Sequence, residues 1–281
     1  MAWTTRPEAG ASESAVALRV RLFELIQGLQ SGEEGAAEEI AGITALAERS
    51  GFDAVVRIGL FGRAVKAWMA QDGSLAQALD ALVDRARLDG DGAMTALGLA
   101  MRAAFLAGPD GELASPEYDA DLAEATVLLG AVDGPALERI SAHTSCGIAF
   151  DYRSLWELGD EQYAAALNLG DGAEPGVRST LLSAVMFNRA EAHVSWAGRM
   201  RQVGDETGVA ELWQSWQSVQ EKAADFELPV LWRSELWSLG QVMAAIAGID
   251  VAREVGQRLA EMHAAGRAEP RARGHLMLAD A

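Results

Sequence analysis

Hydrophobic residues recur along the chain every three or four positions, which places them on one face of a helix. Near the N-terminal end this stripe consists of Leu18, Leu22, Leu25, Ile26 and Leu29. Runs in which hydrophobic and polar residues alternate one by one, the pattern of a half-buried strand, are nearly missing. The pattern therefore predicts an all-α chain.

Short turns rich in Gly, Asp and Ser separate the predicted segments, of which there are roughly thirteen, most about four turns long. The first begins at Ser14, a second contains Ile40 to Ala47, and another begins with Pro135 in its first turn. The other segments predicted to be helical are residues 52–71, 75–88, 93–107, 117–129, 155–169, 177–203, 207–227, 229–247 and 249–265.

Short turns between helices of similar length produce antiparallel helix hairpins. Their spacing is roughly 37 to 53 residues, close to the repeat length of helical solenoids, in which each hairpin buries its apolar face on the next. Hairpins begin near Ser14, Gly51, Asp91, Gly134, Gly176 and Pro229. The sequence thus predicts a single solenoid over residues 14–281, preceded by a flexible lead of residues 1–13.

The segment that begins at Ile140 resembles a tetratricopeptide repeat. Such a repeat has small residues at its eighth, twentieth and twenty-seventh positions and aromatic residues at its eleventh and twenty-fourth. His143 stands where Trp is usual and Asp171 where Pro is usual, but the five defining positions match: Gly147, Phe150, Gly159, Tyr163 and Ala166. The resemblance implies antiparallel hairpins stacked as a right-handed superhelical solenoid.

A second, partial match covers Phe187 to His193, in a helix about two turns longer than the repeat, so the motif resemblance spans residues 140–203. The sequence NRAEAHVSWA, residues 188–197, is similar to the N-terminal region of actinobacterial diguanylate cyclases, in which helical repeats precede a GGDEF catalytic domain. No GGDEF-like sequence occurs here. The resemblance implies a role in c-di-GMP signalling, for a regulatory part that continues or is truncated at its C-terminal end, or for a stand-alone relative.

Composition narrows the classes of partner. The formal net charge of −18 disfavours binding to nucleic acid phosphates or to anionic lipid headgroups. A single Cys excludes a disulfide framework and a Cys-cluster metal site. The chain has neither a signal peptide at its start nor an apolar run long enough to span a bilayer, so we expect a cytoplasmic bacterial protein.

The motifs of common enzyme, cofactor and metal sites are missing from the sequence. It has no Gly-rich phosphate loop, nucleophile elbow or zinc-binding helix motif. The segment from Asp89 to Gly92 begins like a calcium loop but lacks the terminal Glu, which predicts a turn. His143 and Cys146 lie one helical turn apart but at positions that pack inside the hairpin. We expect no catalysis, cofactor or metal; the alternative is a helical enzyme with an unrecognised site.

The repeat resemblance assigns a binding groove to the concave face of the first helix in each hairpin. A Lys that could clamp a peptide carboxylate is missing there, because the chain has Lys only at Lys66 and Lys222. We expect a sensory or protein-interaction module that binds a peptide, a partner helix or a small ligand in this groove. Its predicted residues are Ser141, Thr144, Ser145, Ile148, Asp151, Tyr152, Asn188 and Glu191.

Five of the eight Trp residues lie between residues 196 and 237. One interpretation is that these side chains fill the core between long helices. The other is an aromatic surface for a partner helix, an apolar ligand or a second copy of the chain, because Trp is a frequent interface anchor. The second interpretation makes a self-associating scaffold, a homodimer, the other alternative function. Its interface candidates are Trp213, Trp216, Trp232 and Trp237.

Overall fold

The computed structural model describes residues 13–30, 32–71, 73–106, 115–173, 175–225 and 230–248. These residues contain eleven α-helices, one short 3-10 helix and no strand, so the all-α prediction is confirmed. The predicted lead lies outside the described residues except for Glu13, and so does the predicted helix at 249–265.

The helix bounds agree with the sequence prediction to within a few residues. The helices are α1 (Glu13–Gln30), α2 (Ala36–Ser50), α3 (Asp53–Ala70), α4 (Leu75–Asp89), α5 (Gly92–Phe105), α6 (Pro116–Ala131), α7 (Ala136–Asp151), α8 (Trp156–Asn168), η1 (Gly170–Gly172), α9 (Pro175–Val203), α10 (Glu206–Asp225) and α11 (Val230–Ala247).

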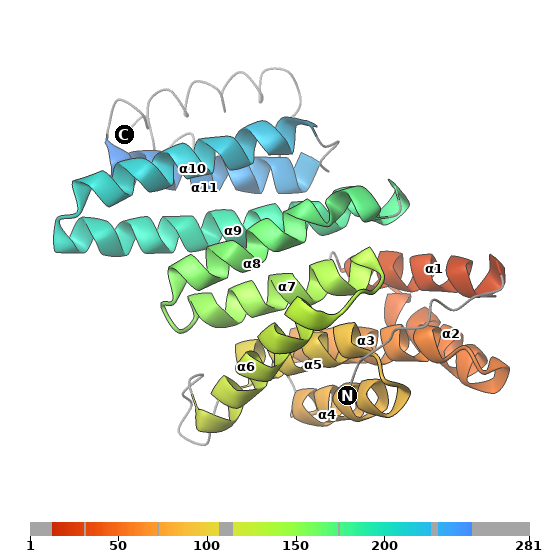
Figure 1. The fold of residues 1–281 in the computed structure, drawn as a ribbon. Helices are drawn as coiled ribbons and strands as arrows, with labels where there is room; N and C mark the ends of the chain where they lie inside the picture. The colour runs from red at the N-terminus through yellow and green to blue at the C-terminus, as the bar shows by residue number, and fades with distance from the viewer. Residues whose placement is uncertain are drawn as a thin grey trace.

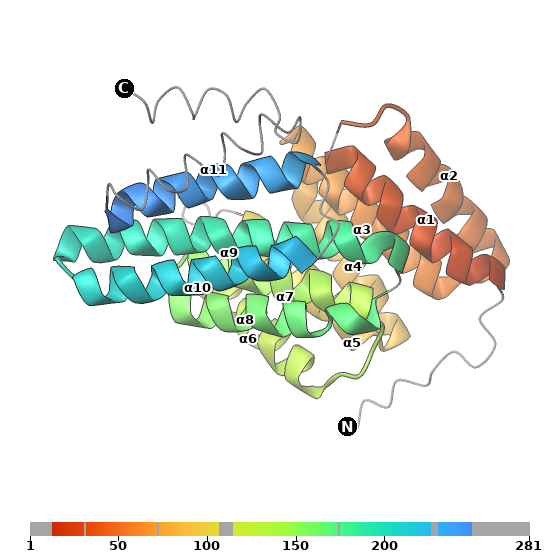
Figure 2. The same ribbon diagram turned by 90° about the horizontal axis from the view of Figure 1, so that it is seen from above.

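The odd-numbered helices form an inner layer and the even-numbered helices lie outside it (Figure 1). Each even-numbered helix contacts mainly the two helices that flank it in the sequence, whereas α1 packs on α3, α5 on α7, α7 on α9 and α9 on α11. The first helix also contacts α9, so the inner layer curves back on itself. The long helix α9 packs against both α10 and α11, which run along it (Figure 2).

The turn between α4 and α5 shows how Gly and Asp punctuate the chain. Gly90 ends α4 with a φ of 73°, in the left-handed region that favours glycine. The Asp91 side chain then accepts a hydrogen bond from the backbone N–H of Met94 at 3.0 Å and caps the start of α5. The prediction that this segment is a helix-to-helix turn is confirmed.

Small residues let α7 and α8 approach closely. A Cβ atom on Gly147 would lie 2.6 Å from the ring of Tyr163, and one on Gly159 would lie 3.3 Å from the carbonyl oxygen of Gly147. Phe150, Tyr163 and Ala166 are buried as well. All five positions singled out by the repeat resemblance are therefore buried, and the glycines lie where a side chain would not fit.

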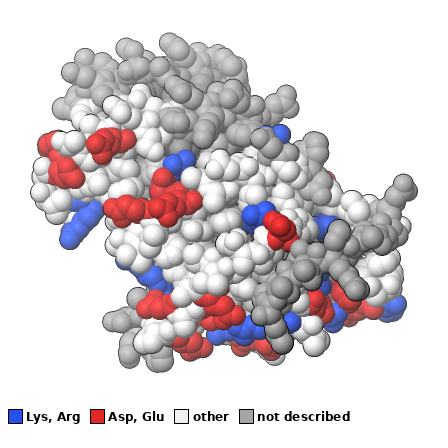
Figure 3. All heavy atoms as spheres, viewed as in Figure 1, with Lys and Arg blue, Asp and Glu red and all other residues white. Residues whose placement is uncertain are grey.

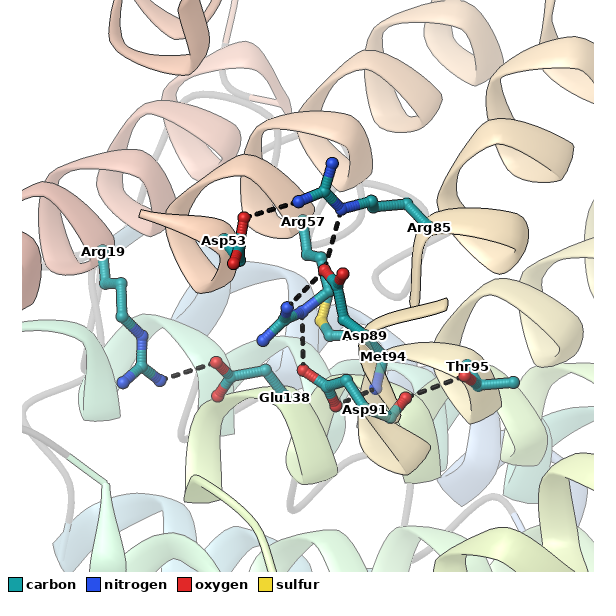
Figure 4. Close-up of polar contacts among 9 residues, drawn as sticks. All are labelled: Arg19, Asp53, Arg57, Arg85, Asp89, Asp91, Met94, Thr95 and Glu138. Carbon is teal, nitrogen blue, oxygen red and sulfur yellow. Dashed lines mark hydrogen bonds and ion pairs between the residues drawn. The ribbon is translucent and has the colours of Figure 1, made fainter. Parts of the chain in front are cut away.

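Buried ion pairs connect α3 with the turn between α4 and α5 (Figure 4). The Arg57 guanidinium, only 8% exposed, lies 2.7 Å from a carboxylate oxygen of Asp89 and 2.8 Å from one of Asp91. Arg85 bridges Asp89 and Asp53. These carboxylates bind Arg side chains, and the described part of the chain contains no cluster of His, Cys, Asp or Glu that could hold a metal ion.

A further ion pair joins α1 to α7 across 119 residues of sequence (Figure 4). Nη2 of Arg19 donates to Oε1 of Glu138 at 2.6 Å, and the Glu138 side chain is 5% exposed. Burial raises the pKa of the Glu138 carboxyl, and the positive charge of Arg19 opposes that rise. Together with the contact between α1 and α9, this pair closes the inner layer of helices.

Exposed acidic groups outnumber basic ones on the face shown in Figure 3, and broad uncharged areas separate them. The excess of acidic groups there agrees with the formal net charge of −18. None of the helices in the described residues combines the length and the apolar character needed to cross a bilayer.

We predict that Gly147→Ala destabilises the protein by about 1 to 3 kcal/mol, because the new Cβ would press on the buried ring of Tyr163. Gly42→Ala is the matched control, since Gly42 lies within α2 and a Cβ there meets nothing within 4 Å. It should stabilise the protein by roughly 0.5 to 1 kcal/mol through helix propensity. Urea unfolding of the two variants measures both effects, and equal stabilisation by both would contradict the close contact.

We also predict that Arg19→Met costs about 3 to 5 kcal/mol at neutral pH, because it leaves Glu138 buried without its cation. The deficit should shrink as the pH falls, since protonation removes the unpaired charge. Adding Glu138→Leu to the same chain should restore most of the free energy of unfolding.

The control for this prediction is Arg21→Met, which breaks an ion pair with Glu39 whose two side chains are 43% and 46% exposed. It should leave the free energy of unfolding nearly unchanged, because water screens exposed pairs. If denaturant unfolding shows the same small loss for Arg19→Met, the pair does not hold α1 against α7.

Candidate functional site

A partly open cavity of about 330 Å³ lies inside the inner layer of helices. Its lining residues come from α1, α3, α5, α7 and α9, so every inner helix up to α9 contributes. Small-molecule sites in proteins typically have volumes of roughly 300 to 1,000 Å³. The cavity is therefore large enough for a small ligand, and helices far apart in the sequence, from α1 to α9, meet there.

One wall of the cavity is aromatic and comes mainly from the first half of the chain. The ring centroids of Trp68 and Phe105 lie 4.8 Å apart, and those of Phe23 and Phe61 lie 6.3 Å apart. Phe187 of α9 and the aliphatic side chains of Ile26, Val65, Met101 and Leu181 extend this surface. The sequence pattern does not reveal this wall, because its residues are divided among α1, α3, α5 and α9.

A second wall, the polar wall, comes from α7, the residue that follows it, and α9. Its residues follow a helical spacing: Ser141, Thr144, Ser145 and Ile148 on α7, Tyr152 directly after α7, and Ala184, Asn188 and Glu191 on α9. Residues three and four apart share a helix face, so the residues of each stripe lie on one face of their helix. The groove positions carried over from the repeat resemblance fall on these two stripes.

Seven of the eight predicted groove residues line this one cavity. They are Ser141, Thr144, Ser145, Ile148, Tyr152, Asn188 and Glu191. Asp151 is the exception and corrects the groove assignment: its side chain turns toward α8 and accepts a hydrogen bond from the Tyr163 hydroxyl at 2.6 Å. The physical reason is that Asp151 is the last residue of α7, on the face that packs against α8.

The polar wall has an uneven supply of hydrogen-bond donors and acceptors. Ser141 donates its hydroxyl proton to the carbonyl oxygen of Leu137 at 3.0 Å, and Thr144 donates to that of Ile140 at 2.7 Å. Such back-bonding is common for hydroxyl side chains within helices. Because a hydroxyl has one proton, these two groups keep only lone pairs for a ligand. Asn188 uses one of its amide N–H groups in the same way, on Ala184.

The ionisable residues of the cavity, Tyr152 and Glu191, lie at its rim. Tyr152 is 55% exposed, and Glu191 is also exposed. Partial burial raises the pKa of Tyr152, and the negative charge of Glu191 raises it further. Glu191 is the one carboxylate among the described lining residues, which include no Lys, Arg or His.

Asp151 forms a separate acidic site behind the cavity, between α7 and α8. Burial raises the pKa of its carboxyl to about 7; the hydrogen bond from Tyr163 opposes this, and the charges of Asp160 and Glu191 add to it. Burial also raises the pKa of the Tyr163 phenol. Asp151 is therefore partly protonated near neutral pH, unlike an ordinary surface carboxylate.

His143 and Cys146, which lie one helical turn apart and were expected to pack inside the hairpin, have an environment that gives little support to a nucleophile pair. Burial raises the pKa of the Cys146 thiol to about 12, so the thiol stays protonated at neutral pH. Burial likewise lowers the pKa of His143, whose Nδ1 lies 2.8 Å from Oε1 of Gln162. Neither residue lines the cavity, and both fill the interior around α7.

A charged cluster that sequence reasoning missed joins α8 to α9. Asp160 accepts hydrogen bonds from Nε and Nη2 of Arg189 at 2.6 and 2.9 Å, and it lies 2.7 Å from Nε2 of His193. Burial alone raises the pKa of Asp160, but the contacts with His193 and Arg189 outweigh it and hold that pKa well below its usual range. The cluster holds one face of α9 against α8 and leaves the face with Asn188 and Glu191 toward the cavity.

The Trp-rich segment packs partly into the core. Trp213 and Trp216 stack with their ring centroids 5.5 Å apart, and Trp216 is completely buried. A Cβ atom on Gly240 would collide with the Trp216 ring, so this indole fills the space between α10 and α11. Trp213 is half-buried, and the side chains of Trp232 and Trp237 lie outside the described residues.

No protein-family model matches the chain, and neither the comparison with curated proteins nor the comparison with solved structures finds a match. What the cavity binds therefore has to be inferred from its own residues.

The raised pKa of Asp151 yields a prediction about stability. An unfolded Asp ionises near its ordinary pKa of 3.8, whereas folded Asp151 holds its proton until about pH 7. At a pH between 3.8 and about 7, unfolding therefore releases a proton from Asp151. The contribution of Asp151 to the free energy of unfolding is complete below pH 3.8 and is lost as the pH rises through about 7. Asp151→Asn should remove this loss of stability, so above neutral pH the variant should unfold at a higher temperature than wild type.

Thermal unfolding of both proteins across this pH range measures the effect. Asp119→Asn serves as the control, because Asp119 is a 55% exposed carboxylate that pairs with Arg153. If the stability of Asp151→Asn fell with rising pH as steeply as that of wild type, the raised pKa would be contradicted.

Proposed function

We propose that this chain is a non-catalytic sensory module that binds a small molecule in the cavity between its inner helices. The observation that carries the proposal is the convergence of α1, α3, α5, α7 and α9 on one cavity of about 330 Å³ with an aromatic and a polar wall. Mostly apolar cavities with a few placed polar groups are the usual small-molecule sites. A bound helix or extended peptide requires a groove that is open along its length, which makes a small ligand the better fit.

The same geometry supports a mechanism for signalling. A ligand that touches α1 and α9 together favours the conformation in which these helices are closed, because it binds that conformation better. The helix α9 also packs against α10 and α11, so a change in its position reaches the C-terminal part of the described chain. In this proposal a TPR-like cytoplasmic sensor transmits ligand binding to a partner or an output domain. A link to c-di-GMP signalling rests only on the resemblance of residues 188–197.

The two alternatives from the sequence gain less support. A dimer seam built on the Trp-rich segment would need exposed rings, but Trp216 is completely buried within its own chain. An enzyme would need converging catalytic groups in the cavity. Among its described lining residues only Tyr152 and Glu191 are ionisable.

The proposal predicts that filling the cavity abolishes ligand binding. Ala184 lines the polar wall, so Ala184→Phe places a ring inside the cavity. The probes are three compounds with one naphthalene body: naphthylethylamine, naphthylethanol and naphthylacetate. We expect wild type to bind at least one of them in calorimetry, and Ala184→Phe to bind it about tenfold more weakly or not at all.

The matched control is Ala210→Phe, which adds the same ring at an exposed position of α10. It should bind like wild type, and circular dichroism should show all three proteins to be helical. Undiminished binding by Ala184→Phe would overturn the proposed site, and so would failure of wild type to bind any of the three probes.

A further inference from the structure

The aromatic wall determines what kind of molecular body the cavity accepts. Trp68 and Phe105 lie with their ring planes tilted by 36° and their centroids 4.8 Å apart, and Phe61 and Phe187 extend the surface around them. Flat rings bury large apolar areas and favour offset or tilted contact with other rings. A ligand with a flat, apolar body fits this wall best.

The polar wall determines which hydrogen-bonding groups the ligand has to carry. The hydroxyl oxygens of Ser141 and Thr144 accept hydrogen bonds but have no proton left to donate. Asn188 keeps its amide oxygen and its second amide N–H group, Ser145 and Tyr152 each carry a hydroxyl, and Glu191 adds two carboxylate oxygens that can only accept when ionised. Ser141, Thr144 and ionised Glu191 accept hydrogen bonds without donating any, so the wall accommodates a ligand whose polar end carries N–H donors beside them.

The charges around the cavity also favour a ligand with hydrogen-bond donors, because they favour a cation. Glu191 places a negative charge at the rim, and the basic residues next to the lining residues of α7 and α9 are paired with other groups. Arg153 binds Asp119 and two backbone carbonyl groups, and Arg189 binds Asp160. An anionic ligand would find no positive side chain among the described lining residues and would be repelled by Glu191. A cation would gain from Glu191 and from the faces of the nearby rings.

From these three features, and resting on the proposed function, we infer that the cavity recognises a protonated amine attached to a flat apolar body. The body lies against Trp68 and Phe105, the ammonium group lies at the rim beside Glu191, and its N–H groups reach the hydroxyl oxygens of α7. The excess negative charge of the whole chain attracts such a ligand and repels its anionic analogues.

The naphthalene series tests this inference directly, because its members share one body and differ in the charge of the polar end. We expect naphthylethylamine to bind wild type about tenfold more tightly than naphthylethanol, and naphthylacetate to bind most weakly. The preference of the amine over the alcohol should shrink as salt is added, since Glu191 is exposed and its field is screened.

Glu191→Gln should weaken binding of the amine by about tenfold and change binding of the alcohol by less than about twofold. The control is Glu211→Gln, which removes an exposed carboxylate of α10 outside the cavity and should change neither. Equal affinity for amine and alcohol, or tighter binding of the acetate, would overturn the inferred ligand class. In that case a loss of binding in Ala184→Phe would still support the proposed function, so the two failures can be distinguished.

Discussion

The ion pair between Arg19 and Glu138 is the interaction on which the shape of the cavity depends. It joins the first helix to the seventh across 119 residues, and with the contact between α1 and α9 it makes a row of hairpins close on itself. Among the described helices, α1 also packs against α2 and α3 and contacts α9. Because removing two charges from water costs several kcal/mol, a buried pair contributes little net stability. Its effect is positional: only one placement of α1 brings Arg19 to Glu138, and that placement brings Phe23 and Ile26 to the cavity.

The helix α9 is the second element that shapes the cavity, because one of its faces packs against α8 and another lines the cavity. Arg189 and His193 lie four residues apart on the face that binds Asp160 of α8. Asn188 and Glu191 lie on the face toward the cavity. Since a helix is rigid over such a distance, fixing the first face fixes the second. The same helix also packs against α10 and α11, so it connects the polar wall with the C-terminal part of the described chain.

Sequence periodicity predicted what depends on a single helix or on one hairpin. The helix bounds follow from the hydrophobic stripes and the Gly and Asp turns. The repeat resemblance, not the spacing alone, assigned the groove residues, and seven of them line the cavity. Sequence periodicity did not predict the aromatic wall, since Phe23, Phe61 and Phe105 lie on three separate helices and meet only after these have packed. The same is true of Arg19 and Glu138, whose separation leaves no local signal. Asp151 was misassigned because repeat position alone does not show which way the last residue of a helix turns.

The buried ion pairs show which carboxylates of this acidic chain are paired with Arg. The chain has 23 basic residues against 41 acidic ones, and several of its Arg side chains lie buried against carboxylates. Arg57 pairs with Asp89 and Asp91, Arg189 pairs with Asp160, and Arg19 pairs with Glu138. These pairs use Arg because its planar guanidinium binds two carboxylate oxygens or two partners at once. Glu191, on the rim, has no such partner among the described lining residues, so its charge remains for whatever enters the cavity. The distribution of the Arg residues, more than the net charge itself, supports the inferred preference of the site for a cation.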